Sequence, residues 1–212
     1  GEGTEGSIDY QVTPGFTGTL TTDVDGLIPS DVTMAEPVSD GPSGGEFLDD
    51  AWIPFTVPAG TGTLRVSLFD EEISVPGTDM DLYLVNSSFQ IVAQSAVGGS
   101  DESVTLHDPA AGSYFVAIDY WDGEAGESAV VPTHIWTVTD EDAGNMTVSP
   151  ESVSTTMGEP VDMTVAWAGL ESYSRYLGAV NYHEGEEHVG KTVVSVTTGD
   201  PVVERWGGEN RY

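Results

Sequence analysis

Hydrophobic and polar residues alternate along this chain with a period of two, which is typical of β-strands with one buried face. The pattern is clearest in residues 62–69 (GTLRVSLF), 113–121 (SYFVAIDYW) and 160–167 (PVDMTVAW). Segments rich in Gly, Pro, Asp and Ser, such as VPAGTG and SVPGTD, separate these runs and indicate turns. We find no helical periodicity longer than one turn. The pattern therefore predicts an all-β fold.

The chain of 212 residues is predicted to contain two β-sandwich domains. An acid cluster and a Gly in residues 137–150 (TVTDEDAGNMTVSP) interrupt the strand pattern, so we place the boundary near residue 139. The first domain then covers residues 1–139. The second covers residues 140–212 and has the strand number and spacing of a small fibronectin- or immunoglobulin-like sandwich.

Within the second domain, the apolar pattern predicts six strands. They are expected at residues 146–149, 152–156, 160–167, 175–182, 188–196 and 202–206. The clearest element is a hairpin over residues 179–196. In the first domain, residues 29–50 are polar and rich in Gly and Pro, so we expect a mobile loop or a loosely held edge there.

Charge is the extreme feature of the composition, because 36 acidic and five basic residues give a net charge of −31. Such a surface repels phosphate backbones and anionic membranes, so neither nucleic acid nor a membrane is expected as a partner. It attracts divalent cations, although adaptation to high salt explains the acidity without any binding site. No apolar run is long enough to cross a membrane. There is no Cys, so a disulfide framework is excluded.

No catalytic constellation is recognisable, so we expect that the chain itself is not an enzyme. A G-x-S-x-G motif is absent, and the Ser in GPSGG has the wrong spacing. His107 in a turn and His134 in a strand are expected to be structural or surface residues. His183 and His188 in HEGEEH are five residues apart, which is too far for the zinc-binding H-E-x-x-H helix. We expect them to face each other across a hairpin, where they either chelate a metal with a Glu or flank an ordinary acidic turn.

One group of acids is placed in a way that favours calcium. If Met80 and the alternate residues of DMDLYLV face the core, Asp79 and Asp81 share the opposite, outward face. Asp119 and Asp122 in the segment DYWDGEAGE supply further carboxylates. Calcium takes about six to eight oxygen ligands, often from carboxylates and loop carbonyls. These four Asp residues are the predicted calcium site; the alternative is that Asp79 ends a turn and Asp81 is a solvated strand residue.

Three segments of the first domain together resemble the bacterial pre-peptidase C-terminal domain family. They are a D-x-D-L-Y-L strand at residues 79–84 (DMDLYL), a strand at residues 90–95 (QIVAQS) and an A-G-x-Y-x-V strand at residues 111–118 (AGSYFVAI). The resemblance covers residues 50–121, with the segments in the right order. It implies a jelly-roll-like β-sandwich that aids the attachment, secretion or stability of an enzyme, and some members of this family bind calcium.

Residues 146–196 are similar to the fibronectin type III-like module that follows such a domain in secreted subtilisin-like serine proteases. The tandem implies a non-catalytic, monomeric accessory region from the C-terminal part of a secreted bacterial protease. Its expected partners are the parent catalytic domain and a protein or polysaccharide substrate. The opening GEGTEG, without Met, indicates a piece of a longer protein. The alternatives are a structural spacer and a carbohydrate- or cell-surface-binding module of another secreted hydrolase, in which exposed Tyr120, Trp121 or Trp206 would stack on sugars.

Overall fold

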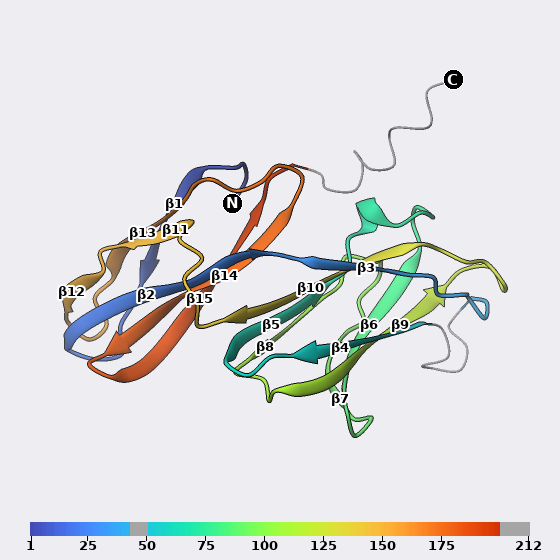
Figure 1. Cartoon of the computed structure of the whole chain (residues 1–212), viewed down its shortest axis with the longest axis horizontal. Helices are drawn as coiled ribbons and strands as arrows, with labels where there is room; N and C mark the ends of the chain where they lie inside the picture. Colours follow the sequence, from blue (N-terminus) through green and yellow to red (C-terminus); the bar gives the residue numbers. More distant parts are fainter. Residues whose placement is uncertain (43–50, 200–212) are drawn as a thin grey trace. The chain divides into compact units, whose positions relative to one another are not determined.

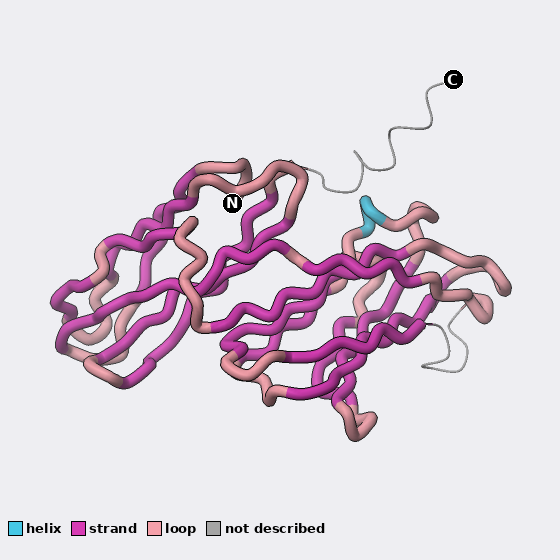
Figure 2. The backbone as a smooth tube through the Cα atoms, viewed as in Figure 1, coloured by secondary structure: helices cyan, strands magenta, loops and turns pink. Residues whose placement is uncertain are grey.

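The computed structural model describes residues 1–42 and 51–199, which form strands joined by turns and loops (Figure 2). Among these described residues, only the short turn η1 (Asp70–Glu72) is helical. The all-β prediction is therefore confirmed. The chain divides into two compact units (Figure 1): unit 1 comprises Gly1–Ser30 and Val138–Tyr212, and unit 2 comprises Asp31–Thr137.

The described part of unit 1 is a sandwich of two antiparallel sheets, ordered β1-β13-β11 and β12-β2-β14-β15. Its strands are β1 (Gly6–Val12), β2 (Gly18–Pro29), β11 (Met146–Ser149), β12 (Ser152–Thr155), β13 (Val161–Trp167), β14 (Arg175–Glu184) and β15 (Glu187–Thr197). Alternate residues of these strands point between the sheets and form its core, which includes Leu20, Leu27, Met163, Trp167, Val180 and Val196.

The division into units differs from the predicted domains. The prediction assigns residues 1–30 to the first domain, whereas the structure places them in the unit that holds residues 138–199. β1 pairs with β13 over its whole length, and β2 lies between β12 and β14. The predicted boundary near residue 139 coincides with the point where the chain leaves unit 2 and returns to unit 1, at Val138. The period-two pattern shows which residues face a core, but it does not show which strands are neighbours.

The predicted hairpin of the second domain is confirmed by β14 and β15, which pair from Arg175↔Thr197 to Glu184↔Glu187. The strands predicted at residues 146–149 and 160–167 are also present, as β11 and β13. A strand predicted at residues 202–206 lies outside the described residues. Gly178 of β14 is required where β2 approaches most closely, because a Cβ there would lie 2.5 Å from the carbonyl oxygen of Asp25.

The described part of unit 2 is a sandwich of two four-stranded sheets, ordered β3-β10-β5-β8 and β4-β9-β6-β7. Its strands are β3 (Asp31–Ala35), β4 (Ala51–Val57), β5 (Thr61–Ser67), β6 (Asp79–Asn86), β7 (Ile91–Ser95), β8 (Ser103–His107), β9 (Gly112–Asp122) and β10 (Val131–Thr139). β3 lies within residues 29–50 and pairs with β10 at the edge of its sheet, so for Asp31–Ala35 the expected edge is found rather than the mobile loop.

The strands of unit 2 pair in the order of a jelly roll. The first pairs with the last (β3 with β10), and the pairs β4–β9, β5–β8 and β6–β7 follow inward along the chain. A long hairpin of four strand pairs, rolled so that alternate pairs lie in different sheets, has the jelly-roll arrangement. The jelly-roll prediction is thus confirmed for unit 2, within residues 31–137 rather than 1–139.

Both faces of the sheet β4-β9-β6-β7 carry buried apolar residues. One face lies in the main core of unit 2, with Met80, Leu82 and Leu84 of β6 fully buried. The opposite face carries a separate apolar cluster centred on Tyr83 and Val85. We call this second face the outer face; it is formed by Asp79, Asp81, Tyr83 and Val85 of β6, by Phe115, Ala117 and Asp119 of β9, and by Trp52 of β4.

Candidate functional site

The four predicted acids lie together on two neighbouring strands. β6 and β9 are antiparallel, and their register places Asp79 opposite Asp122 and Asp81 opposite Asp119. Residues directly opposite each other in such a pair have Cβ atoms about 4.5–5.5 Å apart. Two pairs of carboxylates therefore stand opposite each other at one end of the outer face, with a register irregularity between Asp79 and Met80.

Burial separates these acids into two kinds. Asp81 and Asp119 are 8% and 5% exposed, whereas Asp79 is half-buried and Asp122 is exposed. The alternative of a solvated Asp81 is therefore wrong. Asp79 accepts a hydrogen bond from the backbone N–H of Gly99 at 3.0 Å, so the loop between β7 and β8 contacts this end of the outer face. Strand alternation predicted the face correctly, but it did not reveal the loop.

Glu102 is a further acid in this cluster that the sequence analysis missed. It is 1% exposed, and its Oε1 accepts a hydrogen bond from the backbone N–H of Val97 at 2.8 Å. Its Oε2 is buried and has no hydrogen-bond partner. In the sequence it stands in a Gly- and Ser-rich turn among 36 acids, so no local signal distinguishes it. A buried, unpartnered carboxylate oxygen is costly and calls for a ligand.

The acids influence one another electrostatically. Burial raises the pKa of Asp81; the hydrogen bond that Tyr83 donates to its Oδ2 at 3.1 Å lowers it in part, and the charges of Asp79 and Glu102 raise it further. The pKa of Tyr83 is also raised, first by burial and then by Asp81. Among the described residues, the charged groups that shift these two pKa values are all carboxylates. The cluster consequently has a strongly negative potential that favours a cation.

An aromatic cluster occupies the other end of the outer face. Phe89, in the β6–β7 turn, stacks on Phe115 with ring centroids 5.5 Å apart, and Trp52 packs edge-on against both rings. Phe89 is 71% exposed and has a φ of 58°, which is uncommon for a bulky residue. An exposed Phe held in such a conformation is a candidate contact residue.

The aromatic residues named from the sequence behave differently from one another. Tyr120 is buried, and its hydroxyl donates a hydrogen bond to Glu127 at 3.0 Å. The pKa of Tyr120 is raised to about 12, mainly by burial. Trp121 is exposed, and Trp206 lies outside the described residues. Tyr120 is therefore unable to stack on a ligand, and Phe89, which was not singled out, is the most exposed aromatic ring among the described residues of unit 2.

The two His of the β14–β15 hairpin face each other as predicted. His183 and His188 are cross-strand partners, with ring centroids 5.4 Å apart. His183 Nε2 lies 2.7 Å from Oδ2 of Asp23, which is an ion-pair distance without hydrogen-bond geometry. Asn181 donates hydrogen bonds to Asp23 and Asp25, both at 2.9 Å, so β2 anchors this region. Burial raises the pKa of Asp25, and the hydrogen bond from Asn181 offsets this in part.

Residues 1–42 and 51–199 contain neither a preformed metal site nor a helix that could span a membrane. No group of three or more His, Cys, Asp and Glu side chains in these ranges is arranged to hold a metal ion as it stands. Within the same ranges, no helix has the length and hydropathy of a membrane span. A cation at the acid cluster would therefore require some side chains to turn, and Asp79 and Asp122 are the two of its four Asp residues that are not buried.

A jelly-roll unit whose outer face joins acids and aromatic rings thus defines the candidate site. Residues 49–119 match the model of a family described as the bacterial pre-peptidase C-terminal domain. The match covers about a third of the chain, lies inside unit 2 and includes β6 and most of β9. This confirms the resemblance inferred for that segment. The domain is non-catalytic and occurs in secreted bacterial proteins, typically as a C-terminal domain of proteases.

Other comparisons show weak likenesses. A β-glycosidase from Bacteroides vulgatus aligns with 82% of this chain at 7% identity and a TM-score of 0.27. The VP2 subviral particle of infectious bursal disease virus aligns with 88% of this chain at 11% identity and a TM-score of 0.20. The chain covers 34% of the first structure and 42% of the second. No curated protein matches the chain.

Proposed function

We propose that this chain is an accessory region of a secreted bacterial protease of the subtilisin-like serine class, and that it attaches the parent enzyme to its substrate or to a surface. The observation that carries this proposal is the match of residues 49–119 to the pre-peptidase C-terminal domain. The seven described strands of unit 1, divided three and four between its sheets, agree with a fibronectin- or immunoglobulin-like companion module. The expected partners are the parent catalytic domain and an insoluble substrate.

The aromatic cluster of the outer face is the proposed attachment surface. Trp52, Phe89 and Phe115 form a continuous set of ring contacts, and Phe89 presents its ring to solvent. Exposed aromatic rings supply a large contact area at a small cost in side-chain entropy, and they stack on both peptide groups and sugars. The adjacent acid cluster would favour a substrate that carries basic residues.

We expect the chain to co-sediment with insoluble protein particles and Phe89→Asn to weaken this binding about tenfold, because the variant removes an anchor ring. Asn is the appropriate replacement since it tolerates the positive φ at this position. The matched control is Met157→Ser, which removes a side chain of similar exposure (63%) from unit 1. The bound fraction is measured by sedimentation at fixed ionic strength.

Sedimentation separates the proposed function from its alternatives. Binding to insoluble polysaccharide but not to protein would favour a carbohydrate-binding module of another hydrolase. Absence of binding to either material would favour a structural spacer. Equal binding by the wild-type chain and Phe89→Asn would remove the outer face as the attachment surface while leaving the accessory role in place.

A second candidate function is calcium-dependent stabilisation of unit 2 by the acid cluster. Glu102 carries this proposal, because its buried Oε2 has no hydrogen-bond partner. The charges of Glu102 and Asp79 act on Asp81, and the charges of Glu102 and Asp119 act on Tyr83. Oxygen ligands of this kind suit calcium. In the proposed site, Asp79, Asp81, Asp119 and Asp122 bind calcium with Glu102, and the loop between β7 and β8 closes over the ion.

Calcium is expected to raise the unfolding temperature of unit 2 relative to EDTA, at fixed high ionic strength. A site filled at about 100 times its Kd adds about 2.7 kcal/mol. Asp81→Asn should abolish this response and should itself stabilise the calcium-free chain, because it removes the repulsion with Asp79 and Glu102. Asp108→Asn, an exposed change in the same unit, is the control. An unchanged midpoint, or a calcium response that survives in Asp81→Asn, would contradict the site.

A further inference from the structure

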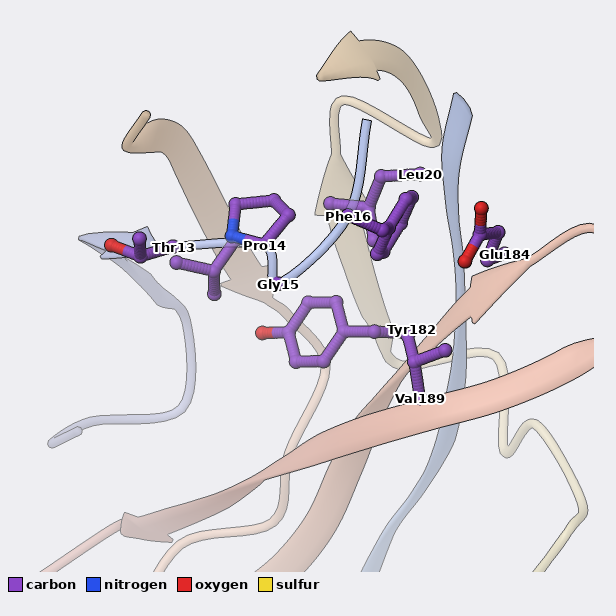
Figure 3. Close-up of a pocket in the computed structure, with 9 residues that line it drawn as sticks. Thr13, Pro14, Gly15, Phe16, Leu20, Tyr182, Glu184 and Val189 are labelled. Atoms are coloured by element: carbon purple, nitrogen blue, oxygen red, sulfur yellow. The ribbon is translucent and has the colours of Figure 1, made fainter. Parts of the chain in front are cut away.

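Unit 1 has a cavity of about 330 Å³ at one end of its sandwich (Figure 3). The connection between β1 and β2 contributes Pro14 and Phe16, and the β14–β15 hairpin contributes Tyr182, Glu184 and Val189. The volume is at the lower end of the range of small-ligand sites, which is about 300–1,000 Å³. The accessory role proposed for unit 2 makes no use of this cavity.

The walls of the cavity are largely apolar and are held in place. Leu20, which is buried in the core, adds an aliphatic surface beside the ring of Phe16. The hydroxyl of Tyr182 lies 2.8 Å from that of Tyr10 and 2.8 Å from Oγ1 of Thr192. These hydrogen bonds fix the Tyr182 ring, so the cavity offers a preformed surface and binding requires little reorganisation.

Among the described residues that line the cavity, one side chain is charged. Among the residues that line it, Glu184 is the one that carries a carboxylate. Glu184 is exposed and makes no hydrogen bond or ion pair with any residue in the described part of the chain. A Cβ at Gly18 would lie 3.4 Å from Oε1 of Glu184 and 3.5 Å from the ring of Phe16. The carboxylate and the ring therefore flank the same point.

We propose that this cavity binds the side chain of a Lys or Arg residue from a partner polypeptide. Such a side chain has an aliphatic stem and a cationic head, and it matches a cavity with apolar walls and one unpaired carboxylate. The stem packs against Pro14 and Leu20. The head lies between the carboxylate of Glu184 and the faces of Phe16 and Tyr182, where cation–π attraction adds to the ion pair. The net charge of −31 accelerates the encounter with a basic partner.

The test uses the full chain and four probes that separate the stem, the charge and the peptide backbone. They are the N-acetyl amides of lysine, arginine and norleucine, and butylamine. Backbone amide shifts are followed by NMR at about 0.15 M salt, so that weak contacts with the acidic surface are screened. The lysine and arginine amides should shift the backbone amide resonances of residues 12–20 and 182–189. They should bind at least tenfold more tightly than norleucine amide, which lacks the charge, and at least tenfold more tightly than butylamine, which lacks the peptide backbone.

Two variants locate the charge. Glu184→Gln should weaken the binding of lysine amide about tenfold and leave norleucine amide unchanged. Glu187→Gln, which alters the residue opposite Glu184 in the hairpin, should change neither. Equal binding of lysine and norleucine amides, or no effect of Glu184→Gln, overturns the proposal. Binding of butylamine as tight as that of lysine amide overturns the polypeptide partner and makes a free amine the ligand. Each of these results leaves the role proposed for unit 2 untouched, because the readout lies in unit 1.

Discussion

A chain that begins at residue 31 is expected to lose the fold of unit 1 completely, whereas unit 2 keeps its structure. The truncation removes β1 and β2, and β2 is an inner strand with β12 on one side and β14 on the other. It also removes the core residues Leu20 and Leu27. Unpaired inner strands leave buried backbone groups without partners, and the remaining strands cannot close a core. Calorimetry should therefore show one cooperative transition in place of two.

Two further chains make this test decisive. A chain in which a short Gly/Ser linker replaces residues 31–137 should fold as unit 1 alone, because it keeps all seven described strands of that unit. A chain of residues 140–212 should remain unfolded. Cooperative unfolding of residues 140–212 by themselves would show instead that the boundary predicted from the sequence marks a true domain.

Removal of the His134 side chain is expected to destabilise unit 2 by about 3–5 kcal/mol, the usual cost of breaking a buried pair. His134 Nε2 lies 2.6 Å from Oε2 of Glu72, and the two side chains are 1% and 0% exposed. Phe69 packs edge-on against the imidazole and Trp136 stacks on it. His134→Ala leaves the carboxylate of Glu72 buried without this partner, and the unfolding midpoint of unit 2 should fall by at least about 10 °C.

Double-mutant analysis identifies the origin of this loss. Glu72→Leu combined with His134→Phe should recover part of the stability, since apolar groups of similar size leave no charge buried. His107→Ala, an exposed change in the same unit, should stay within about 0.5 kcal/mol of the wild type. A coupling energy near zero between positions 72 and 134 would contradict a structural role for this pair.

Part of the candidate site followed from the sequence by strand alternation alone. The spacing of DMDLYL placed Asp79 and Asp81 on one face, and the structure sets Asp122 and Asp119 opposite them. Glu102 was missed because its role depends on a loop that folds back over the sheet edge and buries it. Phe89 was missed for a similar reason, since its contacts with Trp52 and Phe115 join three segments distant in sequence.

The sequence by itself determined the all-β class and most strand positions, because period-two alternation and turn residues are local signals. The jelly-roll expectation for residues 50–121 came instead from the resemblance of three short segments to a known family. Only the tertiary structure decided that residues 1–30 complete unit 1, that Asp81 and Glu102 are buried together, and that Pro14, Phe16 and Glu184 line one cavity. Each of these features joins segments far apart in the chain. Strand pairing and packing select such neighbours through the free energy of the whole core, which no local pattern encodes.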